Sequence, residues 1–199
     1  LTPDLAPSAA PRIINAIWIQ DIALAVMALI GVGWLTRRDG RSTLKRLGIV
    51  WPDLLQIAIG IGLGVLMATL LFLLSSLFEK AGIGVNPHID ELTQKLIGPM
   101  MSSLVGIITL GAAAALGEEM VFRGALQPRF GVLLTALLFA LLHNQYGVSL
   151  ATLVVFILGL VLGWTRKYIN TTTSMFVHAT YNITLALVSL MASNSGWGH

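Results

Sequence analysis

The sequence predicts an all-α protein, a polytopic transmembrane bundle of about six membrane segments, and two observations carry this prediction. Of the 199 residues, 56% are hydrophobic and only 11% are charged, whereas soluble domains carry about 25% charged residues. The apolar residues also gather into segments of roughly membrane-spanning length. We therefore expect a multi-pass integral membrane protein in contact with membrane lipid. The segments lie near residues 13–36, 51–78, 97–127, 131–143, 148–166 and 172–192.

Taken in order, these segments differ in how they begin and end. Residues 1–12 are rich in Pro and Ala, and we expect a loose tail there. In the second segment, Gly60, Gly62 and Gly64 indicate close helix packing rather than a phosphate loop, because no strand precedes them. Residues 128–131 predict a turn between the third and fourth segments, since Pro and Gly interrupt helices. The fourth segment is short for a full span, so we expect it to be tilted, buried or only partly crossing.

The basic residues predict the orientation of the chain in the membrane. If the segments alternate in direction, nine of the twelve Lys and Arg residues fall on one side, which the positive-inside rule identifies as cytoplasmic. This distribution accounts for the net charge of +3 without nucleic acid, and we expect no nucleic-acid partner. The nine are Arg37, Arg38, Arg41, Lys45, Arg46, Arg123, Arg129, Arg166 and Lys167.

The chain has no cysteine, which excludes disulfides, thiolate nucleophiles and thiolate metal sites. Its most informative polar feature is a pair of glutamates, Glu118 and Glu119, at the end of the apolar third segment. A carboxylate at mid-membrane costs roughly 2.5–3.5 kcal/mol on insertion scales, so such a pair requires partners and indicates a function. Glu119 and Arg123 stand at i,i+4 and can pair along one helix face. Glu118 is turned about 100° away and can face something else.

Two further pairs with the same spacing follow, Phe139 with His143 and His178 with Asn182. Glu118 and His143 each lie about twelve residues from the predicted turn at 128–131, or roughly 15–18 Å along antiparallel helices. His178 and Asn182 lie roughly 10–12 Å and 16–18 Å beyond the next turn on the same side. We therefore expect Glu118, His143, His178 and Asn182 to converge in one layer of the cytoplasmic half of the bundle.

The chemistry that such a layer supports is hydrolysis. A buried glutamate beside a second carboxylate can take a proton from water. A histidine can orient that water, ligate a metal or donate to an oxyanion, and an asparagine amide can stabilise an oxyanion at low dielectric. Because Arg123 would keep Glu119 ionised, Glu118 is the expected base.

Together these three motifs resemble the CAAX protease and bacteriocin-processing family of intramembrane proteases, also called the Abi or type II CAAX prenyl endopeptidase family. The family's two glutamates and arginine match Glu118, Glu119 and Arg123. Its aromatic-x-x-x-His motif matches Phe139 and His143, and its second histidine motif matches His178 and Asn182. The resemblance implies a catalytic core at 97–192, preceded by a tail and two variable helices at 1–96 and followed by a tail at 193–199.

The resemblance implies cleavage of a membrane-anchored or lipidated substrate, which in eukaryotic members is a prenylated protein cut after its modified cysteine. In this family, Glu118 would activate water together with His143, while His178 and Asn182 would support the oxyanion. Members are often labelled metalloproteases, although a metal-free glutamate mechanism has also been argued. A zinc ion, if bound, would take Glu118, His143 and His178 as ligands. We expect no obligatory metal, because a glutamate pair with an arginine suits a general base.

The sequence also allows other interpretations. A non-catalytic immunity or scaffold protein of the same fold is the main alternative, and a small proton-coupled transporter is disfavoured because no inverted repeat is evident. The chain lacks His-Glu-x-x-His and Gly-x-Gly-Asp, so it does not resemble zinc or aspartyl intramembrane proteases. His178 and Asn182 could instead form an interhelical hydrogen-bonding pair. Asp21 could border the outer interface or be a buried partner of another helix, and we expect no functional role for it.

Overall fold

The structure is a computed structural model that describes residues 9–82, 98–101, 103–143 and 149–194. These residues are almost entirely helical and contain no strand, so the predicted all-α class is confirmed. Five helical stretches are long and apolar enough to cross a membrane. The elements in chain order are α1 (Ala9–Gly31), α2 (Gly40–Leu47), α3 (Leu54–Lys80), α5 (Leu104–Glu119), the π-helix η1 (Met120–Leu126), α6 (Gln127–Leu142), α7 (Leu150–Tyr168) and α8 (Thr171–Asn194).

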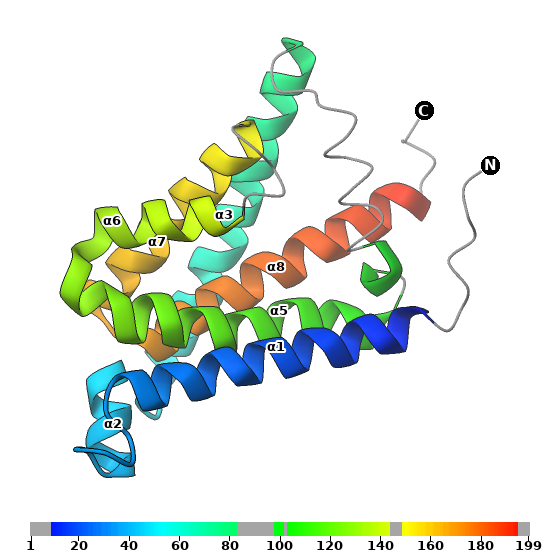
Figure 1. The fold of residues 1–199 in the computed structure, drawn as a ribbon. Helices are drawn as coiled ribbons and strands as arrows, with labels where there is room; N and C mark the ends of the chain where they lie inside the picture. The colour runs from blue at the N-terminus through cyan, green and yellow to red at the C-terminus, as the bar shows by residue number, and fades with distance from the viewer. Residues whose placement is uncertain (1–8, 83–97, 102, 144–148, 195–199) are drawn as a thin grey trace.

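The predicted third and fourth segments form one continuous helical run, Leu104–Leu142, which explains five spans where about six were expected. The run is interrupted at Gly131, whose φ of 75° and ψ of 175° lie outside the helical region. Glycine adopts a positive φ without steric cost. Beyond this residue α6 turns back towards the side from which α5 came (Figure 1). The chain reversal expected at residues 128–131 therefore occurs within an otherwise unbroken helix.

The ends of α1 and α8 differ from the boundaries that were predicted for the two tails. Residues 9–12, expected in a loose tail, already belong to α1, because a proline such as Pro11 is tolerated in the first turn of a helix. At the other end α8 continues to Asn194, two residues past the predicted end of the core. The predicted boundary at 96–97, residues 1–8 and residues 195–199 lie outside the described part of the chain. The division into 1–96, 97–192 and 193–199 stays a prediction.

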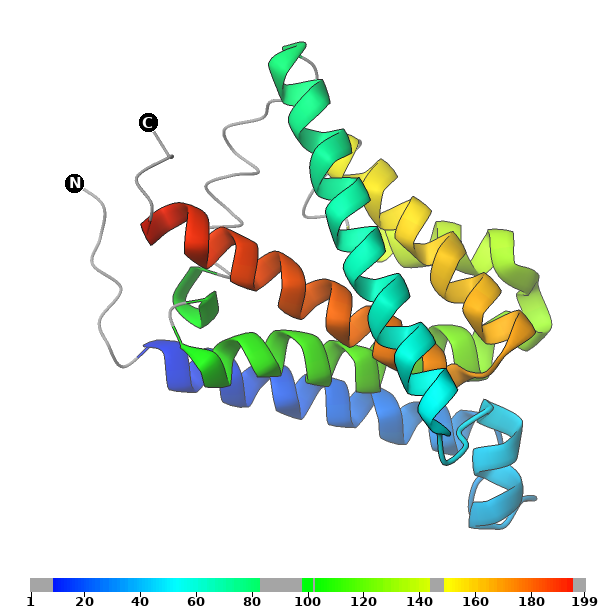
Figure 2. The same cartoon turned by 180° about the vertical axis from the view of Figure 1, so that it is seen from behind.

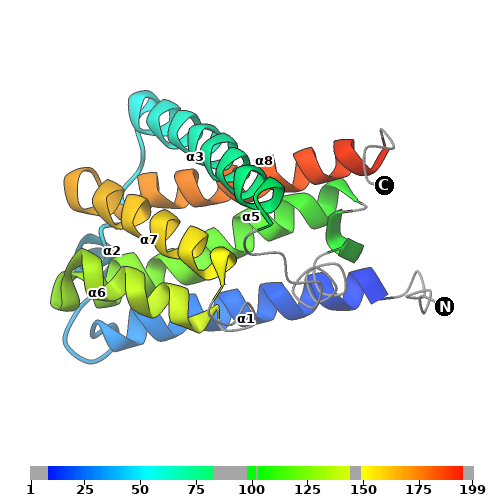
Figure 3. The same cartoon turned by 90° about the horizontal axis from the view of Figure 1, so that it is seen from above.

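Helix α8 is central to the bundle because it packs against both α3 and α5. Helix α1 lies along α5 on the far side, and α6 packs against α7 (Figure 3). Seen from behind, α3 crosses α8 steeply (Figure 2). A cluster of buried apolar side chains joins α3, α7 and α8, and consists of Met67, Ala68, Leu71, Leu158, Leu162, Val177 and Tyr181.

The start of α8 is fastened to the short helix α2. The Thr171 hydroxyl donates to the Leu47 carbonyl, and the Thr171 backbone N–H donates to the Gly48 carbonyl at 3.0 Å. Asn170 caps α8 by accepting the Thr173 N–H at 2.7 Å. Helix α2 has its own cap, Asp39, whose pKa is lowered by the hydrogen bond from the Ser42 backbone N–H. These contacts set the position of His178, two turns further along α8.

Glycines of α3 allow α8 to approach closely. A Cβ at Gly60 would collide with the Cβ of Phe176, and a Cβ at Gly64 would lie 2.6 Å from the Thr180 Cβ. Gly62 has nothing within 4 Å of the same position. The close packing indicated by the glycine series therefore holds for Gly60 and Gly64, which face α8.

We expect Gly60→Ala and Gly64→Ala each to lower the free energy of unfolding by about 1–3 kcal/mol, because an added methyl group overpacks the α3–α8 contact. Thermal unfolding of the detergent-purified protein measures this. Gly62→Ala is the matched control and should leave the midpoint unchanged or slightly raised. Equal destabilisation by all three substitutions would contradict the assigned packing.

Candidate active site

The six residues singled out in the sequence lie on α5, η1 and α8 and at the end of α6, and they separate into two groups. Glu118, His143, His178 and Asn182 line one cavity of about 520 Å³. Glu119 and Arg123 are fully buried behind this cavity and do not line it. The convergence expected from depth counting is thus present in the structure.

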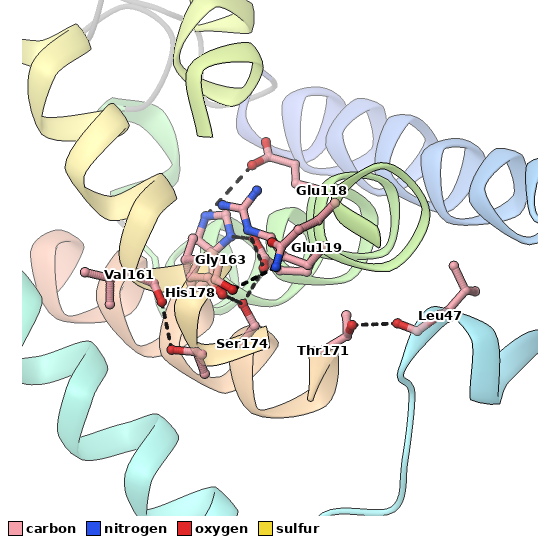
Figure 4. A network of polar contacts seen from close by, with 12 residues as sticks. Leu47, Glu118, Glu119, Val161, Gly163, Thr171, Ser174 and His178 are labelled. Atoms are coloured by element: carbon pink, nitrogen blue, oxygen red, sulfur yellow. Dashed lines mark hydrogen bonds and ion pairs between the residues drawn. The ribbon is translucent and has the colours of Figure 1, made fainter. Parts of the chain in front are cut away.

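Glu119 is the centre of a buried polar network between α5 and α8 (Figure 4). One carboxylate oxygen accepts a hydrogen bond from the Ser174 hydroxyl at 2.6 Å and lies 3.4 Å from Arg123 Nε. The other oxygen accepts from His178 Nδ1 at 3.0 Å. A buried carboxylate is stable only when paired and hydrogen-bonded, and Glu119 meets both conditions.

The pairing of Glu119 with Arg123 agrees with the expected i,i+4 contact, but the helix type differs from the expectation. Directly after Glu119 the chain forms the π-helix η1, in which Arg123 lies. A π-helical segment has a wider turn than an α-helix and often occurs at functional sites. The arginine therefore leaves the α-helical register that the sequence analysis assumed, yet remains within ion-pair distance of Glu119.

Arg123 also stacks on aromatic side chains below the cavity. Its Cζ lies 4.6 Å from the centre of the Phe139 ring and 5.8 Å from that of Phe122. The Phe139 ring is in turn 4.7 Å from the His143 ring and 6.0 Å from the His178 ring. Phe139 is itself buried. Through this ring the two histidines and the arginine are held in one packed cluster.

The hydrogen bonds assign the protonated nitrogen of each histidine. His178 Nδ1 faces a carboxylate and His143 Nδ1 faces the Phe139 carbonyl at 2.8 Å, so in both rings Nδ1 must donate. The Nε2 atom of a neutral ring is then an acceptor. His178 Nε2 lies 3.9 Å from Glu118 Oε2, which is longer than a direct hydrogen bond. His178 thus stands between the two glutamates.

Glu118 and Asn182 complete the polar wall of the cavity. Glu118 Oε2 is a buried oxygen without a hydrogen-bond partner among the described residues, and the side chain keeps 20% of its surface exposed. Asn182 uses one amide N–H to donate to the Leu110 carbonyl at 3.2 Å, which leaves its second N–H for a ligand. A carboxylate acceptor and an amide donor therefore line the same space.

Residues 100–184 match the family model described as type II CAAX prenyl endopeptidase Rce1-like. This segment contains all six residues. Residues 100–184 belong to the Rce1-like family. The chain is also 29% identical over 166 residues to the uncharacterized protein YpbD of Bacillus subtilis (strain 168), an alignment that covers 77% of this chain and 80% of YpbD. No solved structure matches the chain significantly.

Two residues of the site escaped the sequence analysis. Ser174 stands four residues before His178, so the series Ser174, His178, Asn182 on one face of α8 is a signal that could have revealed it. Asp21 was expected to have no functional role. It is 2% exposed, lines the cavity, and lies against Gly117, where a Cβ would be 2.7 Å from the Asp21 carbonyl oxygen. Asp21 belongs to α1, outside the segment that matches the Rce1-like family.

The residues do not fit the zinc set considered from the sequence. Within the part of the chain that the structure describes, no group of three or more His, Cys, Asp or Glu side chains could hold a metal ion. Glu118, His143 and His178 all lie in that part, and they are not brought together there as a metal-binding group. We derive no step of the reaction through a metal.

We expect Arg123→Ala to lower the free energy of unfolding by about 3–5 kcal/mol, because removing one partner leaves the Glu119 charge buried and under-compensated. Arg129→Ala, an exposed arginine six residues along, is the matched control and should change stability by no more than about 0.5 kcal/mol. Chemical or thermal unfolding in detergent compares them. Similar stabilities for both variants would show that the ion pair contributes little.

Proposed function

We propose that this protein is an intramembrane endopeptidase that hydrolyses a peptide bond of a membrane-associated substrate. The observation that carries the proposal is the meeting of Glu118, His143, His178 and Asn182 on one cavity within a bundle of membrane helices. The match of residues 100–184 to a prenyl endopeptidase family supports the same reaction.

Glu118 is the proposed general base. Its Oε2 accepts no hydrogen bond in the described part of the protein, so a water molecule in the cavity can donate to it. The carboxylate takes a proton from this water while the water oxygen attacks the carbonyl carbon of the substrate peptide bond. When the C–N bond breaks, the proton passes to the leaving nitrogen, and Glu118 returns to its carboxylate form. His143, whose Nε2 is an acceptor in the neutral ring, orients the water.

Asn182 and His178 are the proposed support for the oxyanion. The second amide N–H of Asn182 can donate to the oxygen that becomes negative when water attacks. His178 can donate from Nε2 only when both ring nitrogens carry a proton, and its Nδ1 lies 3.0 Å from the Glu119 carboxylate. Glu119, Arg123 and Ser174 act as positioning residues. Glu119 binds the ring of His178, Arg123 and Ser174 bind Glu119, and none of the three lines the cavity.

The walls of the cavity suggest the kind of substrate. Besides the polar residues it is lined by apolar side chains from α1, α3, α5, α6, α7 and α8, among them Phe72, Leu158 and Leu185. Such a space suits a hydrophobic peptide or a peptide with an attached lipid. The family name makes a prenylated CAAX-type peptide the first substrate to test. The excess of basic residues on one side of the predicted topology favours a cavity in the cytoplasmic half of the membrane.

Cleavage of peptides by the purified protein in liposomes tests this function. A farnesylated CAAX-type peptide, its unprenylated equivalent and a transmembrane peptide are incubated with the protein, and the products are identified by mass spectrometry. We expect Glu118→Gln and His143→Ala to lower kcat by about 10²–10⁴, because each removes a proton-transfer or water-orienting group.

Asp53→Asn is the matched control for the loss of a carboxylate. Asp53 is exposed and accepts the Gln56 N–H at 2.8 Å at the start of α3, a cap that asparagine forms equally well. The Asp53→Asn variant should cleave the peptides at the same rate as the unsubstituted protein. Full activity of both Glu118→Gln and His143→Ala would overturn the enzymatic proposal and favour a non-catalytic scaffold or immunity role.

Asn182→Ala separates oxyanion support from substrate binding. We expect kcat to fall by about 10²–10³ with little change in KM, because an oxyanion donor acts mainly in the transition state. Thermal unfolding of the same variant shows whether loss of the Leu110 contact disturbs the fold. A raised KM with an unchanged kcat would instead assign Asn182 to substrate binding.

A further inference from the structure

A second cavity lies at the end of the bundle where α6 begins and α7 ends. It has a volume of about 320 Å³ and is lined by Gln127, Pro128, Gly131, Val132, Arg166 and Lys167. We call it the basic cavity. It shares no lining residue with the candidate active site.

The cavity contains two buried polar atoms without partners among the described residues. Gln127 is 7% exposed, and its Nε2 donates to the Gly163 carbonyl at 2.8 Å, which fixes the amide orientation and leaves Oε1 as an acceptor that receives no hydrogen bond. Arg166 Nε is likewise a buried donor without an acceptor. Both residues line the same cavity, and buried polar atoms without partners are rare in proteins, so the two indicate a place for a ligand.

The charge around the basic cavity is positive and lacks a counter-charge. The ion pairs of the described residues involve only Arg123 and His178, so neither Arg166 nor Arg46 has an acidic partner there. Arg166 is half-buried, with its guanidinium against Gly48 at the end of α2. The pKa of Arg46 is lowered by burial and by the nearby charges of Arg38 and Arg129. Such a concentration of cations attracts an anion.

The surroundings indicate that this anion belongs to a lipid. Close in the chain to the lining residues stand three aromatic residues, Trp164, Tyr168 and Phe130, with 49%, 75% and 48% of their surfaces exposed. Aromatic residues of this kind concentrate at the level of the lipid headgroups. Exposed leucines continue along α6 from the cavity towards the membrane interior, namely Leu133, Leu137 and Leu141. They provide an apolar path for acyl chains.

We propose that the basic cavity binds the headgroup of one membrane phospholipid, with the phosphate on Arg166 and Lys167 and a headgroup O–H or N–H donating to Gln127 Oε1. Basic pockets between membrane helices are suited to anionic headgroups. The contact to Gln127 adds a preference for headgroups that carry a hydrogen-bond donor, such as glycerol or ethanolamine, over choline, which has none.

Native mass spectrometry of the detergent-purified full chain tests this binding without any assay of proteolysis. The probes are phosphatidylglycerol, phosphatidylethanolamine, phosphatidylcholine and inorganic phosphate. We expect phosphatidylglycerol to bind about tenfold more tightly than phosphatidylcholine, since its phosphate is not offset by a cation and makes charge-assisted hydrogen bonds. Phosphatidylethanolamine should also bind more tightly than phosphatidylcholine, although both are zwitterionic, because only ethanolamine can donate a hydrogen bond to Gln127.

Arg166→Gln should weaken phosphatidylglycerol binding about tenfold. Arg12→Gln is the same change near the start of α1, outside the basic cavity, and should leave this binding unchanged. Thermal unfolding without added lipid shows whether each variant is folded. If Arg166→Gln does not fold, Lys167→Gln, at an exposed position, replaces it in the binding measurement. Equal binding of phosphatidylglycerol by the unsubstituted protein and by the folded variant would overturn the proposal. Equal binding of ethanolamine and choline lipids would overturn the contact with Gln127. Displacement of the lipid by an equal concentration of inorganic phosphate would identify a free anion site instead.

Discussion

The carboxylate of Glu119, buried between α5 and α8, is the constraint on which the rest of the site depends. Without partners a charge in this position would cost several kcal/mol. The structure provides three at once, from Arg123, Ser174 and His178. Because these partners come from η1 and α8, satisfying this one charge fixes α8 against α5. It also fixes which nitrogen of His178 carries the proton, and therefore what the ring presents to Glu118.

Contacts of α8 with α2 and α3 also help to position the site residues. Gly60 and Gly64 bring α3 onto α8, while Thr171 binds the start of α8 to α2 and Asn170 binds it to Gln56 of α3. His178 and Asn182 are consequently placed by contacts at both ends of the first three turns of α8. A site that must hold a water molecule and a peptide carbonyl within about half an ångström needs this kind of rigid support.

The two cavities use unsatisfied polar groups in opposite ways. In the candidate active site the unpartnered atom is an oxygen of Glu118, an acceptor suited to water. In the basic cavity the excess is positive, on Arg166 and its neighbours, and suited to a phosphate. One chain thus offers a place for chemistry within the bundle and a place for lipid at its edge, and the two share no lining residue. On the proposed function, the bound lipid would lie beside the helices that enclose the substrate.

The sequence by itself determined the membrane class, the reversal near Gly131 and the residues that converge on the cavity. These follow from local rules: apolar content sets the solvent, glycine sets the turn, and i,i+4 spacing sets the helix face. Tertiary structure alone decided that Glu119 and Arg123 lie behind the cavity, that Ser174 and His178 bind the same carboxylate, and that Asp21 joins the wall. It also decided the π-helical register after Glu119. Such features depend on which helix faces which, and that is set by close packing between residues distant in the chain, such as Gly117 against Asp21, rather than by local spacing.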